Sequence, residues 1–97
     1  MKGYVIASVE VEDPALYETY RAGVLATVEK HGGRFLVRGG RTEQKEGAWQ
    51  PGRIVVLEFP SLEAARTWYD SAEYQPLAAL RGRASRTDIL LLTEGVP

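Results

Sequence analysis

Two short segments of the chain are apolar at every position, and they constrain its fold more than any other feature does. Residues 54–57 read Ile-Val-Val-Leu, and residues 89–92 read Ile-Leu-Leu-Leu. A strand with one face in water alternates apolar and polar residues, whereas a strand that is apolar throughout is covered on both faces. The fold of this chain must therefore cover both faces of a sheet.

The other regular segments complete a strand, helix, strand, strand, helix, strand order. Apolar residues alternate from Tyr4 to Val11, which is typical of a strand. Asp13 before Pro14 is a helix start, and Gly32-Gly33 is a helix stop. Ser61 after Pro60 is a second helix start. We expect strands at 4–11, 34–38, 53–59 and 88–93, and helices at 13–31 and 61–71.

Two less regular segments have weaker signals. The polar stretch 42–50 predicts an outlying hairpin that turns near Glu46-Gly47, with Trp49 covering its base. A short helical turn is expected at 73–80, bent at Pro76 and closed by Gly82. The glycines at positions 39 and 40 indicate a bulge or bend in the second strand rather than its end.

This order of elements predicts one α+β domain over residues 1–97. It packs as a ferredoxin-like βαββαβ fold, a four-stranded antiparallel sheet with the two main helices on one face. The other face would be bare, although Ile6, Val56 and Leu90 or their neighbours lie there. An apolar face of this size indicates an interface. We therefore expect a homodimer that packs sheet against sheet.

Composition excludes several classes of function. The chain has no cysteine, one histidine and a net charge of −1, which argues against a thiol nucleophile, a cysteine metal site and nucleic-acid binding. The basic cluster at 81–86 lacks interleaved aromatic residues. No apolar run is long enough for a membrane span or a signal peptide, so a cytoplasmic protein is expected. Motifs for nucleotides, zinc proteases and hydrolases are absent. We expect no cofactor and no metal, although a carboxylate magnesium site stays open.

The chain as a whole resembles domain of unknown function family 1330, in the dimeric α+β barrel superfamily. The resemblance spans nearly all residues and is carried by a series of short motifs: Gly3-Tyr4, Asp13-Pro14 with Tyr17 and Tyr20, His31-Gly32-Gly33, Arg38-Gly39-Gly40, Trp49-x-Pro51, Glu58-Phe59-Pro60-Ser61, Ala64-Ala65 with Trp68-Tyr69, Ser71-x-x-Tyr74, Pro76-Leu77, Arg81 and Asp88-Ile89. It implies a ferredoxin-like fold and a barrel-like dimer with a cleft between helices and sheet. Related families include cofactor-independent monooxygenases, decarboxylases and isomerases.

His31 and Arg38 are the candidate catalytic residues. His31 has the side chain that titrates nearest neutral pH, so it is either a proton acceptor at the cleft edge or a cap on its helix, and the cap is favoured. Arg38 either holds a substrate carboxylate or pairs with Glu58, Glu10 or Asp88, and the pair is favoured. We expect Arg38 to face away from the helices, because Phe35 and Val37 suit the core better.

The break between the second and third helical segments is the candidate ligand site. Tyr69, Ser71, Tyr74 and Arg81 lie on either side of it, and polar aromatic side chains near a helix break are typical of ligand pockets as well as of cores. Two functions follow as hypotheses. One is a cofactor-independent enzyme acting on a small carboxylated or aromatic molecule. The alternative is a non-catalytic, dimeric ligand-binding or accessory module.

Overall fold

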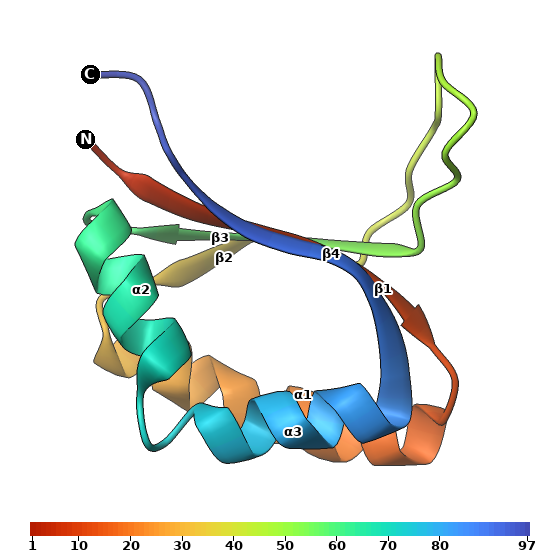
Figure 1. Cartoon of the computed structure of the whole chain (residues 1–97), viewed down its shortest axis with the longest axis horizontal. Helices are drawn as coiled ribbons and strands as arrows, with labels where there is room; N and C mark the ends of the chain where they lie inside the picture. The colour runs from red at the N-terminus through yellow and green to blue at the C-terminus, as the bar shows by residue number, and fades with distance from the viewer.

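The computed structural model describes all 97 residues and has the predicted order of elements. These are β1 (Gly3–Val11), α1 (Pro14–Lys30), β2 (Arg34–Arg38), β3 (Arg53–Phe59), α2 (Leu62–Asp70), α3 (Gln75–Ala84) and β4 (Ser85–Glu94). The four strands form one sheet in the order β2-β3-β1-β4, with every neighbouring pair antiparallel. All three helices lie on one side of this sheet (Figure 1). The predicted ferredoxin-like α+β fold is confirmed.

The first helix begins and ends where its capping residues predict. The carboxylate of Asp13 accepts a hydrogen bond from the backbone N–H of Leu16 at 3.1 Å, which satisfies a donor that the helix itself leaves free. At the other end Gly32 has a φ of 77°, and the N–H of Gly33 returns to the carbonyl of Val28 at 2.9 Å. This reversal sends the chain back along α1 into β2.

Two irregular segments differ from the predictions. Pro76 lies in the first turn of α3, where it needs no N–H donor, so it starts that helix instead of bending it. The helix then continues through Gly82 to Ala84. The predicted hairpin at 42–50 does not form, and this segment contains no strand. Its residues are all exposed, and a hairpin without a buried apolar face is marginally stable. Trp49 is 56% exposed and covers nothing. The segment projects from the sheet on the side away from the helices (Figure 1).

The prediction for Arg38 is wrong because β2 carries a register shift. Phe35 pairs with Leu57 and Arg38 with Val55, but Val37 pairs with Val56, so Leu36 is the extra residue. Such a bulge reverses the alternation of side chains along a strand. Phe35 and Arg38 therefore both point toward the helices, and Val37 points to the opposite face.

Trp68 is the centre of the core between helices and sheet. It is 1% exposed, and its ring centroid lies 4.1 Å from that of Tyr74 and 5.4 Å from that of Phe59. Its indole N–H donates to the hydroxyl of Thr27 at 3.0 Å, and this hydroxyl donates to the carbonyl of Val24 at 2.7 Å. The Thr27 hydroxyl therefore satisfies a buried donor that has no other partner.

Replacing Thr27 by valine tests this contact. Thr27→Val keeps the shape of the side chain but leaves the Trp68 N–H buried and unpaired, so we expect a loss of about 1–3 kcal/mol in the free energy of unfolding. Thr19→Val, at an exposed position of the same helix, is the matched control and should change stability by less than about 0.5 kcal/mol. Urea unfolding of both variants measures the difference. Equal losses would mean that the hydrogen bond contributes nothing.

Candidate functional site

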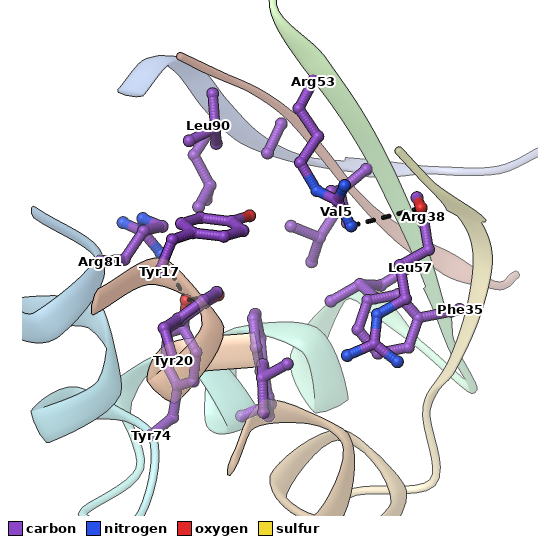
Figure 2. Close-up of a pocket in the computed structure, with 15 residues that line it drawn as sticks. Val5, Tyr17, Tyr20, Phe35, Arg38, Arg53, Leu57, Tyr74, Arg81 and Leu90 are labelled. Carbon is purple, nitrogen blue, oxygen red and sulfur yellow. Dashed lines mark hydrogen bonds between the residues drawn. The ribbon is translucent and has the colours of Figure 1, made fainter. Parts of the chain in front are cut away.

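A cavity lies between the sheet and the helices, and Figure 2 shows the side chains around it. Twelve of its fifteen lining residues are hydrophobic or aromatic, and the other three are arginines. The strands contribute small apolar side chains such as Val5, Ala7 and Val55, and α1 contributes Tyr17 and Tyr20. The free space is about 30 Å³, room for roughly two water molecules. A larger ligand therefore requires a side chain to move.

Arg81 occupies one side of the cavity and is held by a chain of phenol groups. It is 8% exposed and donates a short hydrogen bond from Nη1 to the hydroxyl of Tyr74. Its Nε lies 3.3 Å from the hydroxyl of Thr87. Tyr74 is itself fully buried, and its hydroxyl lies 3.0 Å from that of Tyr20. This chain of polar groups is satisfied within the protein.

Arg38 lies across the cavity from Arg81 (Figure 2). Its guanidinium carbon is 4.2 Å from the centre of the Phe35 ring, and Nη2 donates to the backbone carbonyl of Arg21 at 3.0 Å. None of the predicted partners, Glu58, Glu10 and Asp88, forms an ion pair with it. Glu58 instead pairs with Arg34 at 3.0 Å.

Arg53 is next to Arg38 and is the least satisfied of the three arginines. Its Nη2 donates to the backbone carbonyl of Arg38 at 3.3 Å, and its guanidinium carbon is 5.7 Å from the centre of the Tyr17 ring. The Nε–H of Arg53 is buried without a hydrogen-bond partner. No other buried side-chain nitrogen or oxygen in the chain is left in this state.

The electrostatics of the cavity favour an anion. Neither Arg38, Arg53 nor Arg81 forms a salt bridge with a carboxylate. Burial lowers the pKa of Arg38, and the positive charges of Arg21 and Arg53 lower it further. Burial raises the pKa of Tyr74, and it also raises the pKa of Tyr17. These phenols stay protonated at neutral pH, so they donate hydrogen bonds and do not serve as bases.

The structure brings together only part of the predicted site. Tyr74, Arg81 and Arg38 line the cavity. Tyr69 packs behind Tyr74, with ring centroids 5.8 Å apart. Ser71 holds the turn before α3, where its hydroxyl accepts from the N–H of Tyr74 at 3.2 Å. Both of these residues support Tyr74 from outside the cavity lining.

His31 lies outside the cavity as well. It ends α1, and its Nε2 is 2.7 Å from a carboxylate oxygen of Glu73. Lys30 reaches the same oxygen at 3.2 Å. This cluster ties the end of α1 to the loop that carries Tyr74. The geometry therefore gives His31 a structural contact at the helix end.

Sequence reasoning did not select Arg53, Tyr17 or Tyr20 as site residues. Arg53 begins an apolar strand and reads as an ordinary strand-end charge, and the tyrosines follow the helical spacing of a core stripe. The signal that was available is the pair of glycines after Arg38, which indicates a bend close to a neighbouring group. No group of three or more histidine, aspartate or glutamate side chains forms a candidate metal site. No helix has the length and apolar character to cross a membrane.

The His31–Glu73 contact predicts a dependence of stability on pH. The hydrogen bond from His31 is the main cause that lowers the pKa of Glu73 from 4.5 to about 2. A carboxylate whose pKa is lowered by folding stabilises the native state above its unfolded pKa and loses this contribution as the pH falls through the folded one. The stability advantage of wild type over Glu73→Gln should therefore shrink between pH 4.5 and pH 2.

Urea unfolding at pH values above, within and below this window measures that advantage. Glu43→Gln, at an exposed position without a partner, is the control and should track wild type throughout. A difference between wild type and Glu73→Gln that stays constant over the whole range would contradict the assignment.

Comparison with solved structures shows the same fold in several proteins. A protein of unknown function from Rhodopseudomonas palustris aligns with a TM-score of 0.74 and 15% identity, over 99% of this chain and 83% of that one. SnoaB, a cofactor-independent oxygenase from Streptomyces nogalater, aligns with a TM-score of 0.66 and 16% identity, over 99% and 94%. A protein from Caulobacter crescentus named for an antibiotic biosynthesis monooxygenase aligns with a TM-score of 0.68 and 18% identity, over 99% and 91%.

At these identities the likeness establishes the fold alone. No curated protein matches the chain in sequence. A family model does match, and it covers residues 2–96. The resemblance identified in the sequence is thereby confirmed, and the chain belongs to the family described as a domain of unknown function, DUF1330.

Proposed function

We propose that the protein binds a small organic anion in the cavity between sheet and helices and acts on it without a bound cofactor. One observation carries the proposal: three guanidinium groups line an otherwise apolar cavity, and no carboxylate pairs with any of them. Leaving a partly buried charge unpaired is costly, and a bound anion offsets that cost.

The lining indicates what else the ligand carries. Apolar strand side chains and aromatic rings surround the arginines, so a molecule with an apolar or aromatic body suits the cavity better than an inorganic ion. Guanidinium groups bind planar carboxylates through two parallel hydrogen bonds. Arg38 is the side chain that a ligand can displace, because it is partly exposed and one hydrogen bond holds it.

Catalysis is supported by the kind of groups present and by the fold. Arginines and protonated phenols stabilise negative charge that builds up on a bound molecule, which is the commonest large contribution to enzymatic rate. The likeness to the cofactor-independent oxygenase SnoaB supports a reaction of this general kind. In this proposal the three cavity arginines supply the positive charge, and His31 has no part in the reaction.

A non-catalytic ligand-binding module is the second candidate, and one observation favours it. The cavity lining includes no aspartate, glutamate or histidine, so the groups that most often move protons in enzymes are missing there. The two candidates differ in a simple measurement. Native mass spectrometry of the purified protein identifies a bound molecule. Incubation of the protein with that molecule then shows whether the molecule is converted to a product, as an enzyme requires, or is recovered unchanged.

Substitution of Arg38 tests the binding site. Because Arg38 has no carboxylate partner, Arg38→Met should leave the free energy of unfolding within about 1 kcal/mol of wild type or raise it. Affinity for benzoate should fall by about tenfold or more, as expected when a hydrogen bond to a charged group is lost. Isothermal titration calorimetry with benzoate, and with benzamide as the neutral analogue, measures the affinity.

Arg66→Met is the matched control, since Arg66 is exposed on α2 away from the cavity. It should bind benzoate as wild type does. Equal affinity of wild type for benzoate and benzamide, or no binding of either together with no bound molecule in the mass spectrum, would overturn the proposed function.

We further propose that the protein is a homodimer formed through the open face of the sheet. A row of apolar residues crosses all four strands on that face, paired in register as Val37, Val56, Ile6 and Leu91. Val37 is 38% exposed and Leu91 is 37% exposed, and all helices lie on the other face of the sheet (Figure 1). The Arg34–Glu58 ion pair at 3.0 Å lies beside this row, two residues along β3 from Val56, and resembles the polar rim of an interface.

Light scattering at micromolar concentration tests the dimer. Wild type should have twice the chain mass of 10.7 kDa, and Leu91→Lys should shift it toward the monomer because the row would bury a charge. Leu25→Lys is the matched control, at a position of similar exposure, 41%, on α1. A wild-type monomer, or equal effects of the two substitutions, would contradict this interface.

A further inference from the structure

We infer that Gly39 is a positioning residue for Arg53, and that the carboxylate of the ligand binds to the guanidinium edge that this arrangement leaves free. The inference rests on the proposed function and deepens it in two ways. It names the group that the ligand presents, and it assigns the anion to the Arg53 side of the cavity.

The backbone at Gly39 makes room for the arginine. Gly39 has a φ of 69°, a conformation that side chains disfavour, and its N–H donates to the carbonyl of Ile54 at 2.8 Å. Ile54 is the neighbour of Arg53, so this bond fixes the turn beside the arginine. A Cβ at position 39 would lie 2.1 Å from Nη1 of Arg53 and 2.3 Å from its Cζ. The guanidinium occupies the space where any other residue would carry a side chain.

The same turn holds a second nitrogen of Arg53. Nη2 donates to the carbonyl of Arg38, the residue before Gly39, at 3.3 Å. Nη1 and Nη2 therefore both lie against the backbone of residues 38 and 39. The remaining donor, Nε–H, is buried and has no partner in the protein.

A ligand carboxylate is the group that matches this donor. The guanidinium is planar and presents Nε–H and an Nη2 hydrogen on one edge, which is the pattern that a carboxylate accepts with two parallel bonds. Arg38 adds a second positive charge on the same side of the cavity (Figure 2). Arg81, on the other side, already donates to Tyr74 and Thr87. The anion therefore belongs to Arg53 and Arg38, and the body of the ligand extends toward the tyrosines.

The test compares two adjacent glycines. In Gly39→Ala the new methyl group meets the tip of a flexible side chain, so the guanidinium moves, and the positive φ at this position adds backbone strain that lowers stability. We expect affinity for benzoate to fall by about tenfold or more, the loss expected for Arg53→Met as well. Gly40→Ala is the matched control, because a Cβ there would meet nothing within 4 Å, and it should bind benzoate as wild type does. Titration calorimetry on the full chain measures all three variants.

A double variant separates positioning from a general effect on the fold. If Gly39 acts through Arg53, adding Gly39→Ala to Arg53→Met causes no further loss of benzoate affinity, whereas independent effects would add. The double variant also covers the case in which Gly39→Ala folds poorly. Methionine lacks the nitrogen that occupies the space, so Arg53→Met should restore the part of the stability of Gly39→Ala that the clash costs, while the backbone strain at residue 39 remains.

The outcomes distinguish this inference from the proposed function. Wild-type binding of benzoate with equal affinity in Gly39→Ala and Gly40→Ala would overturn the inference alone. Losses that add in the double variant, or no recovery of stability when Arg53→Met is added to Gly39→Ala, would overturn it as well. Absence of benzoate binding in wild type would overturn the binding site itself, and the inference with it.

Discussion

The register shift at Leu36 in β2 is the constraint on which the rest of the site depends. In a regular strand Arg38 would lie on the face opposite Phe35 and away from the helices. The extra residue turns it inward, where Phe35 pairs with Leu57 and Arg38 pairs with Val55. The shift thereby brings the carbonyl of Arg38 to Arg53 and places Val37 on the outer face beside Val56. One inserted residue thus shapes both the cavity and the open face.

The three arginines of the cavity differ in how much the protein itself satisfies them. Arg81 is held by Tyr74 and Thr87, so its charge is a fixed part of the cavity wall. The hydrogen bonds of Arg38 and Arg53 go only to backbone carbonyls. A fold selected for stability alone has no reason to place two such groups side by side, because like charges repel and burial removes water. This arrangement supports the proposed ligand that carries the opposite charge.

The features that the sequence predicts are those set by local chemistry. The alternation in residues 4–11, the Asp13 cap and the uninterrupted apolar strands are local patterns, and the structure confirms the elements they predict. The errors arise where tertiary contacts decide. The bulge that reverses Arg38 lies at Leu36, and not at Gly39 and Gly40 where the sequence suggests one. Its position depends on pairing with β3, which residues 34–38 do not encode by themselves. In the sequence, Arg53 is an ordinary charged residue at the start of a strand. Only the folded structure shows that its guanidinium lies against Gly39.

The cavity and the open face lie on opposite sides of the same strands, and this separates the two proposed properties. Along β1, Val5 and Ala7 face the cavity, whereas Ile6 belongs to the outer row. A substitution at Ile6 or Leu91 therefore changes the outer face without touching the lining. β2 departs from this separation, because its bulge sets the direction of Val37 and Arg38 together. A change that removes this bulge is therefore expected to alter the proposed binding and the proposed assembly at once.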